Sequence, residues 1–355
     1  MNSLVHNSIK AIVFNLFLFS LASKQSSFGE DNSYLYSTIV GLPIQNSSYS
    51  ITNYNGEINS LQTFRANKKF NPITLIKSRL HLTLGALSNT DEGSSLHTSY
   101  ENKVRISTTF SGADSLVLFL ESGNANSSPL DLDLQSTKGD LINISSLYFN
   151  YPLKKDLNLI IGPRMYGYIG LAGTSTAYNE RIAILDGSNY TTSSGLGPGI
   201  GLSLTKSKGL NASLKLSSSQ DKFTDKSRSI ISQIGYSTNH FGGTVTSNLT
   251  NDFRAYGIAI YTKPYNLPSF SSSIELKEFS NGSTIQNWLL ALQKDFSNSS
   301  IGFGFGTYDQ AQNVLYESWY SFEVSDNIKL IPVMFLKNYY SDEQFGFAIN
   351  TQIKY

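Results

Sequence analysis

Hydrophobic and polar residues alternate along most of the chain from residue 75 to its end. In the last eleven residues, FGFAINTQIKY at 345–355, bulky side chains and Thr351 hold the odd positions, while small or polar side chains hold the even ones. Successive side chains of a β-strand point to opposite faces, so this period of two predicts strands with one apolar face. A half-buried strand of a soluble β-sandwich would show the same alternation, so the pattern of one segment leaves both architectures open.

The alternation divides into sixteen candidate strands, each close to the 9–11 residues that a tilted membrane-crossing strand needs. We predict them at 75–87, 102–111, 114–121, 144–151, 155–163, 196–206, 209–218, 228–237, 239–250, 253–262, 268–279, 283–295, 299–308, 314–324, 326–337 and 344–355.

The polar faces of these strands carry mostly Gly, Ser, Asn and Thr, with few Lys and Glu. In residues 301–307, IGFGFGT, for example, the bulky side chains are opposed by glycines only. Charged residues make up 15% of the chain, below the roughly 25% of a typical soluble domain. Soluble surfaces favour charge, whereas a water-filled lumen tolerates small polar groups, so the composition favours a barrel over a sandwich.

The connections between the predicted strands alternate in length along the chain. Odd-numbered connections include all the long loops, such as 122–143 and 164–195, while nearly every even-numbered one is a tight turn, such as 112–113 or 207–208. Outer-membrane barrels place short periplasmic turns at one end and longer external loops at the other. We therefore predict an all-β fold, a closed antiparallel transmembrane β-barrel of about 16 strands.

The first residues read as an export signal. Lys10 precedes the apolar run AIVFNLFLFSLA at 11–22, which ends in small residues and is followed by polar ones. This run is shorter than the roughly 20 apolar residues of a membrane-spanning helix, so residues 1–22 are predicted to be a cleaved signal peptide. Residues 23–74 fit a periplasmic segment or a plug, and residues 75–355 form the predicted barrel.

Five stretches, in order, resemble the barrel of cyanobacterial porins that carry a surface-layer-homology domain, a family grouped with iron-uptake and carbohydrate-selective porins. The stretches are 103–126, 145–163, 195–204, 287–296 and 316–336. The resemblance covers about residues 60–355. It implies a location in the outer membrane of a Gram-negative-type, cyanobacterial-like bacterium, contact with membrane lipid and, by analogy with general porins, a homo-trimer. The family's surface-layer-homology domain and coiled-coil spacer are absent, so this chain is expected to lack that anchor.

The longest predicted connection is the third external loop, 164–195. In such barrels this loop often folds inward and narrows the pore, and pore loops select solutes through fixed charge at a constriction. Its polar and aromatic candidates are Arg164, Tyr166, Tyr168, Tyr178, Glu180, Arg181, Asp186 and Tyr190. The alternating glycines from 195 to 201 would leave room for an inward-folded loop against the wall. The alternative is an ordinary external loop over the mouth.

Five basic or titratable residues share inward parity on the first two predicted strands: Lys77, Arg79, His81, Lys103 and Arg105. Opposed to Glu180 and Asp186 on the loop, they would create a transverse field across the lumen and give a mild preference for anions. Alternatively, these bases pair with Glu101, Asp114 or Glu121 and only stabilise the wall. Tyrosines near strand ends fit interfacial girdles, namely Tyr148, Tyr151, Tyr236, Tyr256, Tyr320 and Tyr355.

The sequence offers little for catalysis or cofactor binding. There is no cysteine, and the four histidines, at positions 6, 81, 97 and 240, lie in no serine, carboxylate or metal-ligand spacing. The net charge of +1 gives no sign of nucleic-acid binding. We therefore expect no enzyme and no cofactor, but a channel that passes ions and small polar solutes. The alternative is a non-conducting surface scaffold or adhesion barrel closed by residues 23–74 and the long loop.

Overall fold

A computed structural model gives the fold of the chain. It describes residues 72–88, 95–124, 141–173, 175–179, 189–192, 195–218, 228–308, 313–339 and 342–355. The strands are β1 (Ile73–Leu87), β2 (Ser95–Thr109), β3 (Ser115–Gly123), β4 (Asn143–Lys154), β5 (Leu157–Met165), β6 (Gly197–Leu204), β7 (Gly209–Ser218), β8 (Arg228–Ser237), β9 (Phe241–Thr250), β10 (Phe253–Thr262), β11 (Ser269–Phe279), β12 (Thr284–Asp295), β13 (Ser299–Tyr308), β14 (Asn313–Ser325), β15 (Ile328–Tyr339) and β16 (Asp342–Lys354). The described residues also contain one short helix, α2 (Asn189–Thr192).

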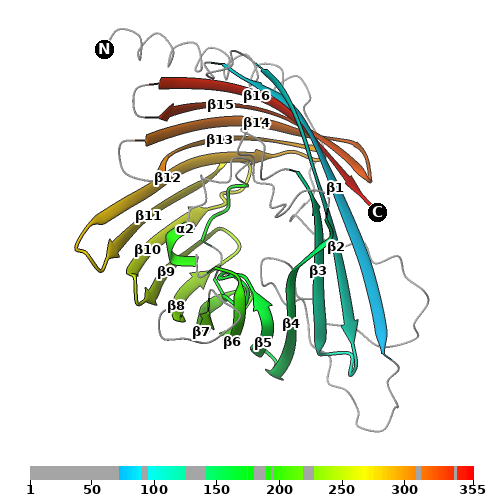
Figure 1. The fold of residues 1–355 in the computed structure, drawn as a ribbon, viewed down its shortest axis with the longest axis vertical. Coiled ribbons are helices and arrows are strands. Elements are labelled where there is room, and N and C mark those ends of the chain that lie inside the picture. The colour runs from blue at the N-terminus through cyan, green and yellow to red at the C-terminus, as the bar shows by residue number, and fades with distance from the viewer. Residues whose placement is uncertain are drawn as a thin grey trace.

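The strands close into a single antiparallel barrel in which each strand pairs with its neighbours in sequence. The ring is closed by β1 and β16, for example where Leu82 lies opposite Thr351. Figure 1 shows the tilted strands surrounding a central space. The predicted barrel of about 16 strands is confirmed, and no strand is left with an open edge.

The outer face of the barrel is apolar. Leucine, isoleucine, valine and aromatic side chains at alternate strand positions stay exposed, with Leu82 at 43%, Val245 at 58% and Ile234 at 61%. An apolar band of this extent around a whole protein suits hydrocarbon rather than water. Among the described residues, no helix is long and apolar enough to cross a membrane.

Aromatic residues form clusters near both ends of the outer face. Towards the end with the longer connections, which we take as external, Trp288 packs edge-on against Phe305 with ring centroids 4.6 Å apart. Towards the opposite, periplasmic end, Tyr236 stacks on Phe241 at 6.1 Å. Rings at these levels suit the two membrane interfaces.

One predicted member of these girdles lies elsewhere. Tyr148 packs on the inner side of the wall against the buried cluster of Ile160, Met165 and Ile169. The reason is a register irregularity in the pairing of β3 with β4, where Phe119 faces Ser146 and the next residue, Leu120, faces Ile144, so that β4 carries one extra residue. Such a bulge changes which face a side chain occupies, so the prediction that Tyr148 belongs to an interfacial girdle, made from its position near a strand end, was wrong.

Two strand boundaries differ from the prediction in ways that matter for the lumen. Strand β2 begins at Ser95 rather than at 102, and its added residues pair with the external end of β1. Strand β5 extends to Met165, so Arg164 belongs to a strand and not to the loop.

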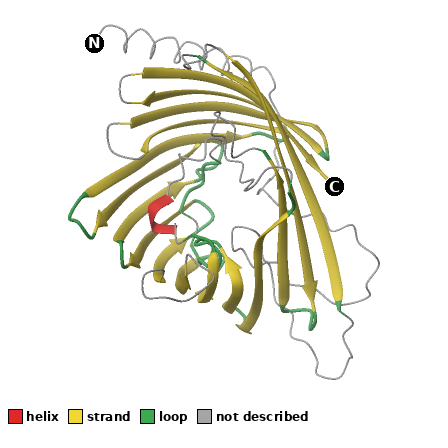
Figure 2. Ribbon diagram, in the orientation of Figure 1, coloured by secondary structure: helices red, strands yellow, loops and turns green. Residues whose placement is uncertain are grey.

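The connection between β5 and β6 is here called the inner loop, and its described residues, 166–173, 175–179, 189–192 and 195–196, fold into the barrel (Figure 2). Figure 2 shows its described parts and the red helix α2 inside the ring of strands. The inward-folding third external loop is thereby confirmed. Its contacts with the inner wall build the candidate site.

Candidate functional site

The start of the inner loop is held by a lysine from the wall. The Nζ atom of Lys215, on β7, donates hydrogen bonds to the backbone oxygens of Tyr166 and of Gly167, the latter at 3.1 Å. Its stem passes over β6, where a Cβ added at Gly199 or Gly201 would lie 3.5 or 3.6 Å from Lys215 side-chain atoms. The inward glycines of β6 were predicted to leave room for the loop. They instead leave room chiefly for the side chain of Lys215, which anchors the loop.

The middle of the inner loop is tied to successive strands by its backbone. Four of its backbone N–H groups donate hydrogen bonds to side-chain oxygens of the inner wall. These bonds replace the hydrogen bonds to water that the four groups lose when the loop packs on the wall. The bonds run from Ala172 to Ser213 on β7 (3.3 Å), from Gly173 to Gln233 on β8 (2.6 Å), from Ala177 to Ser271 on β11 (2.9 Å) and from Asn179 to Gln293 on β12 (2.9 Å). The loop thus follows the wall from β7 to β12.

A buried aromatic anchor lies at the far end of this path. The Tyr178 hydroxyl donates to Glu317 Oε1 on β14 and accepts a 3.1 Å hydrogen bond from the Trp319 indole Nε1. The Tyr178 and Trp319 rings lie 6.1 Å apart. Since Tyr178 is 3% exposed, Trp319 1% and Glu317 1%, this chain of hydrogen bonds is shielded from water and correspondingly strong.

The loop is fixed a third time where it returns towards β6. In α2, both the backbone N–H and the hydroxyl of Thr191 donate to Glu275 Oε1 on β11, at 3.1 and 2.5 Å. The neighbouring wall position on β10 is Gly257, where an added Cβ would lie 3.0 Å from the Thr191 methyl. A larger residue at 257 would push α2 away from the wall.

The inner face of β12–β16 is unusually apolar for a water-filled pore. We call it the apolar inner face; it consists of Leu289, Ala291, Leu315, Trp319, Ile331, Val333, Phe335 and Ala348, which cluster with Leu87 and Tyr178. The sequence pattern predicts small or polar residues on the lumen side, which holds for β6–β9 and for β13 but not for much of β12, β14 and β15. Strand β15 is consequently apolar on both faces over most of its length.

The basic residues predicted on β1 and β2 do come together. Lys77 lies directly opposite Arg105, and Arg79 directly opposite Lys103. On the other side of β1, Arg79 is also opposite Lys354. We call these four residues, Lys77, Arg79, Lys103 and Arg105, the basic ladder. Like charges placed directly across strands are destabilising, but together they create a positive potential on the inner wall.

Part of this charge is neutralised locally. The Nζ atom of Lys103 lies 2.8 Å from Glu121 Oε1 and 3.9 Å from Glu101 Oε1. Two of the three acids proposed as structural partners thus pair with the ladder. The third, Asp114, instead accepts hydrogen bonds from the β2–β3 turn. The ladder therefore combines a wall-stabilising ion pair with further positive charge.

The other predicted site residues separate into two groups. Arg164 is the last but one residue of β5. Tyr166 begins the inner loop, and its ring stacks on that of Tyr168 with centroids 5.5 Å apart. Glu180, Arg181 and Asp186 lie outside the described residues, so their opposition to the basic ladder stays a prediction. Sequence reasoning missed Lys215, Glu275 and Glu317. Their only signal was a charged residue at an inward position of a face made mostly of small or apolar residues.

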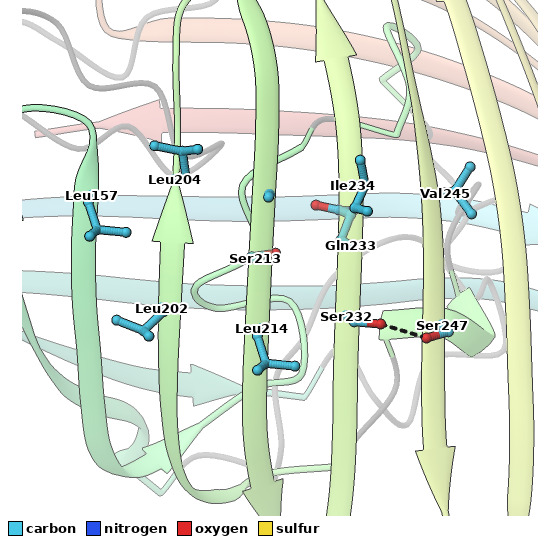
Figure 3. A pocket seen from close by; sticks show the side chains of 11 residues that line it. Leu157, Leu202, Leu204, Ser213, Leu214, Ser232, Gln233, Ile234, Val245 and Ser247 are labelled. Carbon is cyan, nitrogen blue, oxygen red and sulfur yellow. Dashed lines mark hydrogen bonds between the residues drawn. The ribbon is translucent and has the colours of Figure 1, made fainter.

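Metal chemistry finds no support within the part of the chain that the structure describes, because no group of three His, Asp or Glu side chains there could hold an ion. A hollow of about 470 Å³ in the wall is lined by Leu202, Leu214, Ile234 and Val245, and by Ser232 and Ser247, which share a hydrogen bond of 2.7 Å. Figure 3 shows these side chains on β6–β9. Their exposed apolar positions place the hollow on the outer face, outside any solute path through the lumen.

Solved structures of porins share this fold. The chain is similar to the anion-selective porin from Comamonas acidovorans, with a TM-score of 0.58 and 11% identity over 80% of this chain and 100% of that chain. It is similar to Pseudomonas putida OprB, with a TM-score of 0.60 and 7% identity over 79% and 94%. A mutant of the Rh. blastica porin gives 0.54 and 10% over 80% and 100%. No family model and no curated protein matches the sequence. The chain therefore has the fold of the bacterial porins.

Proposed function

We propose that the protein is an outer-membrane diffusion channel that passes ions and small polar solutes through the barrel without energy input. The observation that carries this proposal is the inner loop, which is anchored inside a closed, lipid-facing barrel by side chains from β7, β11, β12 and β14. A loop held across a lumen reduces its cross-section, which selects solutes by size, and the charge around it selects by sign.

The basic ladder supports a preference for anions. Its four side chains come from two adjacent strands and face one another in two rows, and the low-dielectric wall around a water-filled lumen focuses their combined field. One structural neighbour is described as an anion-selective porin, which is consistent with this assignment. Glu180 and Asp186 would supply the opposite pole of the field.

Several finer assignments belong to the same proposal. Residues 1–22 act as the export signal, residues 23–74 remain in the periplasm or enter the barrel, and residues 75–355 form the channel. The resemblance to cyanobacterial porins supports a Gram-negative-type outer membrane of that lineage, with three copies of the chain assembled together and no enzymatic activity.

A second candidate, a non-conducting scaffold or adhesion barrel, is favoured by the apolar inner face, because a closed lumen would not need to be wet there. Current recordings in planar bilayers distinguish the channel from the scaffold. Stepwise currents from the purified protein support the channel, whereas silence at all voltages supports the scaffold.

In a salt gradient, the double variant Lys77→Glu/Arg79→Glu is expected to shift the reversal potential towards cation preference. An unchanged potential would remove the basic ladder from the selectivity filter.

A further inference from the structure

The apolar inner face and the Tyr178 anchor occupy the same part of the wall. Tyr178 belongs to the same buried cluster as Leu289, Leu315 and Val333, and it reaches β14 through Glu317 and Trp319. A large apolar surface facing water is unfavourable, at about 25 cal/mol per Å². Tyr178 packs within this cluster and so removes part of that cost.

Side chains of the apolar inner face are less exposed than those of the basic ladder. Ile331 and Leu315 are 0% exposed and Val333 is 1%, although all three occupy inward positions of a barrel. The Lys103 side chain of the basic ladder is 11% exposed, and Lys77 and Arg79 are half-buried. The basic side chains of the ladder are therefore more accessible to water than the side chains of the apolar inner face.

The wall is also shaped to receive this anchor. A Cβ built at Gly302 on β13 would lie 2.3 Å from the Trp319 ring, so the indole lies flat over the glycine of the paired strand. In this position its Nε1 reaches the Tyr178 hydroxyl at 3.1 Å. Tyr178 itself is flanked by two loop residues, Ala177 and Asn179, whose backbone is held by β11 and β12.

We propose that the apolar inner face of β12–β16 is a docking face for the inner loop and not a wall of the conducting path, and that Tyr178 is the positioning residue that holds the loop there. Solutes then pass on the side of the basic ladder, through an eccentric pore. The path of the solutes rests on the proposed channel function, whereas the docking of the loop does not depend on conduction.

Cysteine accessibility tests it, because the chain contains no cysteine and each engineered thiol is the only one present. Val333→Cys and Lys77→Cys are made in the full-length protein, folded in detergent, and exposed to a charged, membrane-impermeant methanethiosulfonate. Mass spectrometry then follows the rate of modification. We expect Val333→Cys to react at least about tenfold more slowly than Lys77→Cys, since reagent must wait for local opening of the loop.

Adding Tyr178→Ala should raise the Val333→Cys rate about tenfold, which is the order expected for loss of a buried hydrogen-bonded anchor. The matched control is Tyr168→Ala, which removes a tyrosine of the same loop that stacks on Tyr166 away from the apolar inner face and should leave the rate unchanged. Ala291→Cys on β12, 2% exposed, replaces Val333→Cys if that variant does not show the heat-modifiable gel mobility of a folded barrel.

Equal rates at positions 333 and 77 in the presence of Tyr178 would overturn the docking face. A rate at 333 that ignores Tyr178→Ala would overturn the role of that residue. Because mass spectrometry needs no current, these outcomes are distinct from failure of the channel proposal, which would appear as silence of the unmodified protein in bilayers.

Discussion

Trp319 on β14 lies directly opposite Gly302 on β13, and its indole occupies the space that a side chain at position 302 would need. The same arrangement occurs twice more on the inner wall, where Phe335 faces Gly346 and Tyr261 faces Gly242. An aromatic ring that covers a cross-strand glycine shields its backbone and fixes the register of the two strands.

The pairing predicts that Gly302→Ala is costly. The new Cβ would lie 2.3 Å from a ring carbon of Trp319, so the indole must move and lose its hydrogen bond to Tyr178. Overpacking of this kind destabilises by about 1–3 kcal/mol. Urea unfolding in detergent, followed by gel mobility, measures it. Gly201→Ala is the control, because its Cβ would meet atoms at an ordinary 3.5 Å; equal loss in both variants would refute the argument.

Lys215 gives a prediction that separates loop anchoring from barrel stability. Lys215→Met keeps a stem of similar length over Gly199 and Gly201 but removes the donor to the Tyr166 and Gly167 carbonyls. Replacing a buried charge by an apolar side chain is often neutral for stability, so we expect a change within about 1 kcal/mol. The released loop should nevertheless give noisier single-channel currents and faster proteolysis from outside.

The control for Lys215→Met is Lys208→Met, which removes a positive charge from the exposed β6–β7 turn. It should leave current noise and proteolysis as in the unmodified chain. If both variants behave alike, net charge rather than the anchor governs the loop.

Glu121 limits the positive potential of the basic ladder. Its carboxylate lies 2.8 Å from Lys103 Nζ, so Glu121→Gln should remove the nearer of the two carboxylates beside that charge and raise the anion-to-cation permeability ratio, by about twofold. Reversal potentials in a salt gradient measure the ratio, and the effect should weaken at high salt because of screening. Glu278→Gln, on the exposed outer side of β11, removes the same charge outside the lumen and should have no effect.

The strands were predictable because alternation and turn residues are local signals. The predicted ranges 209–218, 228–237, 253–262 and 299–308 coincide with β7, β8, β10 and β13. Residues 95–101 were assigned to a loop because their sequence, SLHTSYE, has little apolar alternation; they become strand by pairing with the external end of β1, for example Leu87 with Ser95. Such an extension depends on a partner strand and not on the segment itself.

The site was predictable only in part, for a related reason. The basic ladder follows from parity on two adjacent strands, so Lys77, Arg79, Lys103 and Arg105 could be placed together. The anchors could not be found this way, because Lys215 and Glu317 meet the inner loop across 48 and 139 residues of sequence. Period-two patterns state which face a residue occupies, but they do not state what lies against that face once the barrel has closed.

Asp114 connects the stability of one periplasmic turn to pH. Its carboxylate accepts hydrogen bonds from the backbone N–H groups of Phe110 and Ser111 at 2.9 and 2.8 Å, and from the Thr109 hydroxyl at 3.0 Å. Burial acts to raise the pKa of Asp114, but these hydrogen bonds outweigh it, and the pKa lies below its ordinary value. The ionised form is therefore the one that the folded turn stabilises.

A group with a depressed pKa in the folded state contributes stability that is complete above its unfolded pKa, near 3.9, and is lost as the pH falls through the folded pKa. Asp114→Asn should accordingly destabilise the barrel by about 1–2 kcal/mol at pH 7. The difference from the unmodified chain should hold down to about pH 5 and shrink below about pH 4. Urea midpoints across this range measure it, with Asp326→Asn in the exposed β14–β15 turn as control. A difference that stays constant to pH 2 would show that the shape of the side chain, and not its charge, holds the turn.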